Sequence, residues 1–319
     1  MIQFLQHEMI DKVRWDQSIA CAVNGNLNAC SWFLDIVSPG WCALVDKNYE
    51  NVFPLPVSSK AGIDYIMQPY FTQQLGLFSR SLPSEKRLRE FLDNIPATYR
   101  YIDINLNTSN TLGSAEYIHS NINLELDLQP GYAEIAAGYH SNLQRNLKKA
   151  QQNKLTLIQH VNPGELISLF RMHKGQQLVH LKDPQYKLIQ QVAEQSLQNG
   201  TGQVWGVTDK ASQLLAAVLW VTCHGKAIFP FSAVTDQGRK QHAMPWLIDI
   251  FIREHAGNPL TLDFEGSNDE SLARFYSNFG ARKIIYQRYR YNSLPLVIRM
   301  AFSSWRLVRE KLKKVIHHM

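Results

Sequence analysis

Near the end of the chain, two carboxylates and a tyrosine stand at positions from which they could take part in proton transfer. Asp263 and Glu265 close an alternating apolar run that is typical of a half-buried strand. Tyr276 falls on the apolar face of the helix predicted to follow. A carboxylate can accept a proton from an attacking group, and a phenol can donate one to a leaving group. The three residues are therefore candidates for general acid–base catalysis, with a packed core tyrosine as the alternative for Tyr276.

Local signals in the same segment predict the elements that would hold these side chains. Ser267, Asn268 or Asp269 can cap the helix, and Glu270 stands where a capping-box partner of Ser267 would reach back. Gly280 fits a left-handed C-cap, after which a last strand begins. The segment therefore predicts strand, turn, helix, glycine stop and strand.

Upstream, apolar periodicity and turn residues predict two amphipathic helices, a meander of three strands and one further helix. In chain order these elements span residues 163–178, 184–199, 203–208, 214–222, 226–234 and 243–255. Pro230 falls inside the third strand, where a proline marks an edge, a bulge or a point at which strands part.

The last helix carries a group of residues in a recognisable order. Asn268, Ala273, Phe275–Tyr276 and Phe279–Gly280 resemble the signature of the GNAT superfamily of N-acyltransferases, and the predicted order of elements is similar to that of the GNAT fold. The resemblance implies a sheet whose fourth and fifth strands part, so that the backbone of the fourth strand faces the acyl donor. It also implies that Tyr276 protonates the leaving group.

The first half of the chain also predicts a mixed α/β domain. Helices are expected at residues 9–23 and 84–94, and strands at 31–37, 41–46, 51–57, 62–68, 99–105 and 121–128. We therefore expect two GNAT-like domains, each a mixed central sheet flanked by helices. A degenerate first domain would span residues 1–130, a basic helix and linker 131–160, the second domain 161–293, and a basic amphipathic helix 294–319.

Between the predicted domains, residues 139–154 form a helical pattern rich in positive charge, for which Ser141 is a plausible N-cap. The apolar face consists of Leu143, Leu147 and Ala150. Arg145, Lys148 and Lys149 lie outside this face, and the segment has no acidic residue. The charges indicate either a solvated helix face or a binding site for an anionic donor or acceptor.

Three short stretches, at residues 141–150, 263–267 and 74–76, resemble segments of FemAB-like proteins. These are tandem-GNAT aminoacyl or acyl transferases and include the enzymes of peptidoglycan interpeptide bridges. The resemblance implies that an acyl group moves from acyl-CoA, or from aminoacyl-tRNA as in several members, onto an amine. The acceptor would be a small molecule or a cell-envelope precursor.

We expect the substrates to bind in a cleft between the two domains, because ligand sites favour domain interfaces. Candidate lining residues are Tyr70, Phe71, Gln74, Asn142 and Asn268. Asp263 or Glu265 would bind or deprotonate the amine. Simpler roles remain open for two of these residues, since Asn268 can cap the helix and Glu265 can favour the helix N-terminus through its charge.

In a CoA-dependent GNAT protein, the turn after the fourth strand binds the donor's diphosphate. From Arg239, the family pattern would need glycine at position 242, where His242 stands, and a small residue at 244, where Met244 stands. The turn thus departs from the CoA motif but stays basic through Arg239 and Lys240. These two residues join Arg145, Lys148 and Lys149 as candidates for binding an anionic donor.

Composition sets broad limits on function. The chain has 319 residues, a formal net charge of +6 and 45% hydrophobic residues, which are ordinary values for a globular protein that can accept an anionic partner. There is no zinc pattern or recognition-helix motif, so we do not expect DNA binding. The four cysteines form no CxxC pair, which favours free thiols in a reducing cytoplasm and no metal.

The predicted C-terminal helix and the lack of long apolar runs are relevant to where in the cell the protein is located. No apolar run reaches the length of a membrane span and no secretory signal is evident, so we expect a cytoplasmic protein. Residues 294–319 are basic and amphipathic, which is typical of a helix that docks on its own domain or lies on the inner membrane surface.

Three hypotheses follow. A FemAB-like acyl or aminoacyl transferase explains most of the features. A CoA-dependent N-acetyltransferase with an atypical phosphate turn is the second hypothesis. A ligand-binding protein that keeps the fold without the chemistry is the third, and the departure of the turn from the CoA motif supports it.

Overall fold

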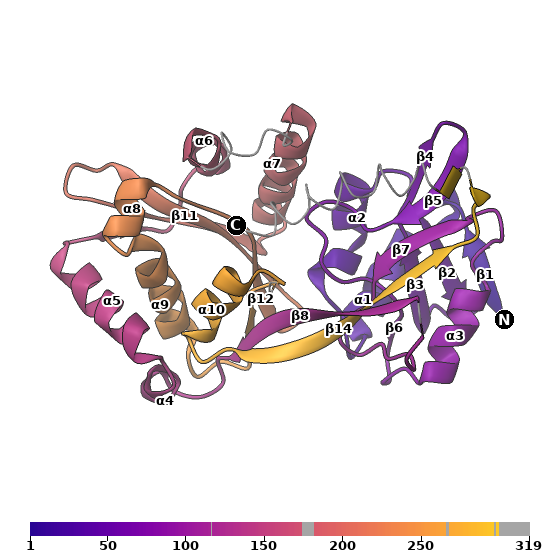
Figure 1. The fold of residues 1–319 in the computed structure, drawn as a ribbon, viewed down its shortest axis with the longest axis horizontal. Helices are drawn as coiled ribbons and strands as arrows, with labels where there is room; N and C mark the ends of the chain where they lie inside the picture. Colours follow the sequence, from indigo (N-terminus) through magenta and orange to yellow (C-terminus); the bar gives the residue numbers. More distant parts are fainter. Residues whose placement is uncertain (116, 174–181, 266–267, 297, 300–319) are drawn as a thin grey trace. The chain divides into compact units, whose positions relative to one another are not determined.

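The computed structural model describes residues 1–115, 117–173, 182–265, 268–296, 298 and 299 (Figure 1). The chain divides into two compact units. One consists of residues 1–122 and the segment that starts at Ile284, and the other of residues 123–283. Ser267, and most of the predicted C-terminal helix, lie outside the described residues.

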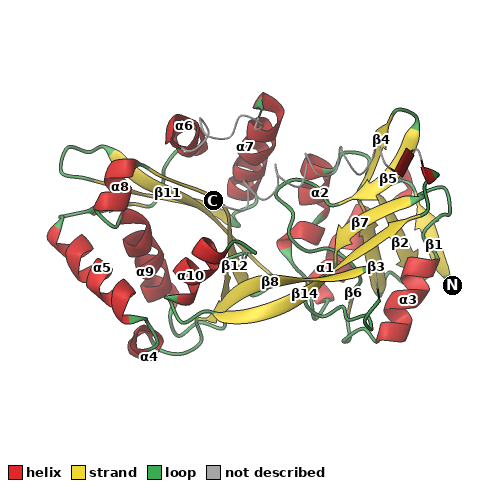
Figure 2. Ribbon diagram, viewed as in Figure 1, coloured by secondary structure: helices red, strands yellow, loops and turns green. Residues whose placement is uncertain are grey.

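The first unit contains two sheets and several short helices (Figure 2). One sheet has the order β1 (Ile2–Leu5), β2 (Cys42–Asp46), β3 (Asn51–Leu55) and β6 (Phe78–Ser79). The other contains β4 (Val57–Lys60), β5 (Ile63–Met67), β7 (Tyr101–Asn105) and β14 (Arg282–Asn292). The helices are η1 (His7–Met9), α1 (Lys12–Cys21), η2 (Leu27–Ala29), α2 (Ser31–Val37) and α3 (Glu85–Asp93).

The predicted strand at residues 31–37 is wrong, because this segment is helix α2. Its start is fixed by tertiary contacts: the backbone N–H and the hydroxyl of Ser31 donate to the Asp16 carboxylate at 2.8 and 2.5 Å. Phe33, Leu34 and Val37 then pack inward. A contact partner this far away in the sequence cannot be seen in a local pattern.

The second unit is built on one mixed sheet. Its strands run in the order β8 (Ile118–Asp127), β13 (Thr261–Asp263), β12 (Lys226–Val234), β11 (Leu214–Cys223), β10 (Gly202–Thr208) and β9 (Thr156–Ile158). The helices are α4 (Tyr132–Ala137), α5 (Ser141–Gln152), α6 (Pro163–His173), α7 (Asp183–Gln198), α8 (Asp236–Lys240), α9 (Ala243–His255) and α10 (Glu270–Ser277).

Helices cover this sheet on both faces (Figure 1). Helices α6 and α7 contact β10, β11 and β12, and Phe170 of α6 packs on Phe231 of β12 with ring centroids 4.7 Å apart. On the other face, α4, α5, α9 and α10 enclose a large apolar core that contains Leu143, Phe251 and Leu262. The predicted meander and the helix at 243–255 are confirmed, as is the mixed α/β class.

Local helix signals in the second unit are largely confirmed. Asp269 caps α10 by accepting from the N–H of Leu272 at 2.9 Å, and Gly280 has φ 79°. The apolar face predicted for α5 is buried. His140, rather than Ser141, is the N-cap residue of α5 and its side chain makes no capping bond. No described helix has the length and apolar character needed to cross a bilayer.

Strand β12 contains a bulge at the predicted proline. Ile228 pairs with Val221 of β11, and Phe231 pairs with Leu219, so Phe229 and Pro230 lie together opposite Trp220. Among the described residues, parallel pairing of β13 with β12 covers Lys226–Ile228. Strand β12 therefore continues to Val234, past the end of β13, as the resemblance to the GNAT fold implies.

A charged cluster, in which Asp263 is buried and Lys226 and Glu125 are half-buried, joins the paired half of β12 to its neighbours. Lys226 Nζ lies 2.6 Å from a carboxylate oxygen of Glu125 on β8 and 3.3 Å from one of Asp263 on β13. The amide of Asn123 donates to both carboxylates, at 3.1 and 3.0 Å. Burial alone would lower the pKa of Lys226, but the two negative charges outweigh it and raise that pKa.

We predict that Lys226→Ala lowers the free energy of unfolding of this unit by about 2 kcal/mol, because it leaves the buried carboxylate of Asp263 and the half-buried carboxylate of Glu125 without a cation. Since the folded-state pKa of Lys226 is raised, this contribution is present at neutral pH and is lost only above the unfolded-state pKa of about 10.4. Urea unfolding at pH 7 measures the change.

The matched control is Lys210→Ala, which changes an exposed lysine in a turn and should cost less than about 0.5 kcal/mol. Equal stability of the two variants would show that the cluster does not stabilise the sheet.

Candidate functional site

The second unit contains a cavity of about 300 Å³ beside β12. Its apolar walls come from β12, α6, α9 and α10. The polar lining residues are Asn146, His173, Ser232, Arg239, His242 and Tyr276. None of the described residues that line the cavity is acidic.

The cavity lies where β12 has left β13. Ser232, Ala233 and Val234, all beyond the bulge, line it. The N–H of Thr235 donates to the Leu215 carbonyl of β11 at 2.9 Å, so by the alternation of a strand the N–H of Val234 points away from β11. The N–H of Val234 is thus directed to the side of β12 opposite β11.

Tyr276 is both a core residue and a wall of the cavity. It is 4% exposed, and its ring stacks on Phe264 and packs edge-on against Phe229, with centroids 4.7 and 5.5 Å away. Burial raises the pKa of the Tyr276 phenol strongly, and the negative charge of Glu265 adds to this effect. The phenol is therefore protonated at neutral pH and can act as a proton donor.

The two candidate carboxylates have different surroundings. The Asp263 carboxylate forms an ion pair with Lys226 and accepts a hydrogen bond from Asn123. It also accepts the backbone N–H of Glu265 at 2.8 Å. This favours a positioning role for Asp263. Glu265 is buried, has a left-handed backbone with φ 47°, and stands close enough to Tyr276 to affect its pKa.

The turn after β12 does not form a diphosphate cradle. It is occupied by the short helix α8, whose N-cap Thr235 accepts the N–H of Gly238 at 2.8 Å. A Cβ on Gly238 would meet the Leu215 carbonyl at 2.4 Å, so this glycine serves packing against β11. Pro245 in the first turn of α9 has no N–H to offer. The residues present therefore do not fit the diphosphate of CoA, which needs several converging donors.

Two histidines that the sequence analysis did not select line the cavity. His173 ends α6, and His242 precedes α9 in a left-handed conformation with φ 57°. Burial lowers the pKa of His242, and the nearby positive charge of Lys149 lowers it further. The departure of position 242 from glycine was the only sequence signal that pointed to this residue.

The predicted basic residues lie on the second unit, and most of them are exposed. Arg239 lines the cavity and lies 3.7 Å from Asp236, and Lys240 ends α8. Arg145, Lys148 and Lys149 are exposed on α5, and of these Lys149 affects His242. Asn142 and Asn268 are exposed at the starts of α5 and α10, respectively.

The candidates of the first unit belong to a buried loop. Asn28 accepts the backbone N–H groups of Gln73 and Gln74 at 3.0 and 2.9 Å. The side chain of Gln74 accepts from Thr108 N–H at 3.0 Å, so its amide supports the loop. Phe71 is 2% exposed with φ 57°, and Tyr70 is half-buried. Substrate binding by these residues stays a prediction.

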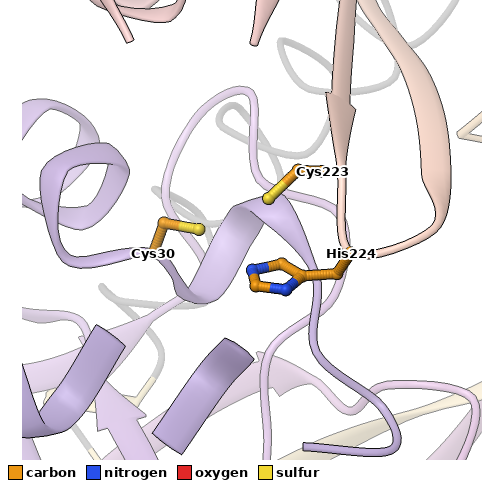
Figure 3. Close-up of side chains that lie close together, drawn as sticks. All are labelled: Cys30, Cys223 and His224. Carbon is orange, nitrogen blue, oxygen red and sulfur yellow. The ribbon is translucent and has the colours of Figure 1, made fainter. Parts of the chain in front are cut away.

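The cysteines are free thiols in the described structure. Cys30 is buried in the first unit, and Cys223 is half-buried at the end of β11 in the second, followed by His224 in the turn to β12 (Figure 3). The expectation that the protein uses no metal stays a prediction.

No protein-family model matches the chain, and no curated protein matches it by sequence. Among solved structures, FemX is similar with a TM-score of 0.62 and 12% identity, over 87% of this chain and 96% of its own.

Two further structures share the fold. One is the C-terminal domain of a putative lysylphosphatidylglycerol synthetase from Agrobacterium fabrum, with a TM-score of 0.54 and 10% identity over 95% of this chain and 96% of its own. The other is L-PGS from Bacillus licheniformis, with a TM-score of 0.53 and 9% identity over 91% and 95%. The chain therefore has the GNAT-type fold of FemX, as its resemblance to FemAB-like proteins predicts.

Proposed function

We propose that this protein is an acyl or aminoacyl transferase whose donor binds in the cavity of the second unit and whose acceptor is an amine. The observation that carries the proposal is that one cavity brings together the end of β12, where the N–H of Val234 points away from β11, and the buried, protonated phenol of Tyr276. The shared fold with FemX and with the lysylphosphatidylglycerol synthetase domain supports it.

Charged tRNA is the donor that we favour. In the turn after β12, Gly238 packs closely against β11 and its N–H is hydrogen-bonded to the Thr235 hydroxyl. These groups are therefore not available to a diphosphate, which disfavours CoA. Exposed Arg145, Lys148 and Lys149 on α5 offer positive charge for a phosphate backbone on the same unit as the cavity. The resemblance to FemAB-like proteins implies the same kind of donor.

The proposed reaction joins the amine nitrogen to the acyl carbon and breaks the ester bond to the ribose oxygen. Glu265 takes the proton that the attacking amine releases. Backbone N–H groups along β12, including that of Val234, stabilise the negative charge that develops on the carbonyl oxygen. Tyr276 donates its proton to the departing ribose oxygen. The small-molecule or cell-envelope acceptor, and action in the cytoplasm or at the inner membrane surface, belong to this proposal.

The test is a transfer assay with the full chain, labelled aminoacyl-tRNA or acetyl-CoA as donor, and amine acceptors that include lysine-containing peptidoglycan precursors. Transfer from aminoacyl-tRNA supports the proposal. Transfer from acetyl-CoA alone would establish the CoA-dependent alternative, and tight ligand binding without transfer from either donor would favour a binding protein.

We predict that Tyr276→Phe lowers kcat at least about 100-fold while the fold is kept, because general-acid catalysis typically contributes a factor of 10² to 10⁴. The control is Tyr186→Phe, which removes the hydroxyl of a buried tyrosine that does not line the cavity. Single-turnover rates and thermal melting are measured for both. Undiminished turnover in Tyr276→Phe would remove the proton-donor role.

We also predict that Glu265→Gln lowers kcat by about 10²-fold or more, since glutamine keeps the shape but cannot take a proton. The rate of this variant should lose the rise with pH that a catalytic carboxylate gives to the wild-type profile. Glu194→Gln, an exposed substitution on α7, serves as the control. An unchanged pH–rate profile in Glu265→Gln would show that another group accepts the proton.

A further inference from the structure

The α8–α9 turn brings a guanidinium and an imidazole to the wall of the cavity. Arg239 and His242 line the cavity there, with Lys149 of α5 near enough to lower the pKa of His242. The amide of Asn153, the C-cap residue of α5, donates to the Gln241 carbonyl at 3.2 Å, which ties this turn to α5. One turn therefore supplies two side chains that can donate hydrogen bonds to an anion.

His242 has a backbone conformation that is uncommon for histidine. Its φ of 57° is in the left-handed region, which glycine or asparagine adopts at lower cost. As N-cap of α9 its side chain makes no capping hydrogen bond. The ring instead lines the cavity. The imidazole therefore has no role in capping α9, but it is placed to contact a ligand in the cavity.

The number of hydrogen-bond donors at the α8–α9 turn fits a single phosphate better than a diphosphate. A guanidinium and an imidazole N–H can bind one phosphate group. The N–H of Gly238 already donates a hydrogen bond to the hydroxyl oxygen of Thr235, and Pro245 has no N–H. His242 stands where the CoA motif would need a glycine, so its imidazole adds a side chain beside the left-handed turn.

We propose that His242 selects the donor: together with Arg239 it binds a single phosphate near the 3′ end of an RNA donor, and its ring keeps the diphosphate of CoA out. This inference rests on the proposed function and names the residue that sets its donor class. It predicts that removing the ring weakens RNA binding and opens the turn to CoA.

The charge state of His242 gives the proposal a pH signature. A neutral imidazole donates one hydrogen bond, and a protonated one adds a positive charge, so RNA affinity should rise as the pH falls from 7.5 to 5.5. The charged or titratable groups around His242 are Lys149 on α5, Arg239 with its partner Asp236 on α8, His173 on α6 and Tyr276 on α10. A His173→Gln variant, which keeps His242, should keep the pH dependence.

The experiment is calorimetric titration of the full chain with two probes, CoA and a short single-stranded RNA that ends in CCA. The variants are His242→Gly, which suits the left-handed backbone, and His242→Asn, which tolerates it and cannot titrate. His160→Ala, an exposed histidine that does not line the cavity, is the control.

We expect the wild type and His160→Ala to bind the RNA at least about tenfold more tightly than CoA, since a charge-assisted phosphate contact is a strong one. His242→Gly should lose that preference through weaker RNA binding and tighter CoA binding, and His242→Asn should lose the pH dependence. Wild-type RNA binding with no change in His242→Gly would overturn the role of His242 and leave the proposed function standing. Tighter binding of CoA than of RNA by the wild type would overturn both the role of His242 and the proposed donor.

Discussion

The parting of β12 from β13 is the constraint on which the candidate site depends. Over Lys226–Ile228 the two strands are paired, and the charged cluster of Lys226, Glu125 and Asp263 holds that half of the ladder to β8. The bulge at Phe229–Pro230 follows directly, and among the described residues the ladder to β13 extends no further. Beyond the bulge, Ser232, Ala233 and Val234 line the cavity, and the N–H of Val234 points away from β11. The bulge thus separates the half of β12 that pairs with β13 from the half that lines the cavity.

Around this edge, burial shifts the pKa values of two groups that line one cavity in opposite directions. Tyr276 packs against Phe229 and Phe264, and burial there raises the pKa of its phenol. His242 is partly buried beside Lys149, and both effects favour its neutral form. Groups whose surroundings move their pKa values apart are suited to separate roles. The two groups come from different elements, since Tyr276 lies on α10 and His242 in the turn before α9.

The sequence allowed prediction of those elements whose signals are local. The bounds of β12 and α9, the cap of α10 and the bulge at Pro230 all follow from periodicity, capping residues or the chemistry of proline. Helix α2 was missed because its start depends on Asp16. The pairing of Asp263 with Lys226 joins strands that are adjacent only in the folded sheet, so the sequence could nominate Asp263 but not its surroundings. His242 was visible only as a departure from a glycine, and its contact with the cavity required the fold.

In the proposed function, the turn after β12 recognises the donor and is separate in the fold from the groups proposed for the reaction. The groups proposed for acyl transfer, the edge of β12, Glu265 and Tyr276, come from strand and helix positions fixed by the core. The groups proposed for recognising the donor come from α8 and position 242, which pack on β11 and α5 rather than on the reacting groups. A change of helix or residue in this turn alters the phosphate contacts while the core that positions Tyr276 stays intact. At 12% identity this chain and FemX share the fold, which depends on strand register and packed helices rather than on the identity of the turn.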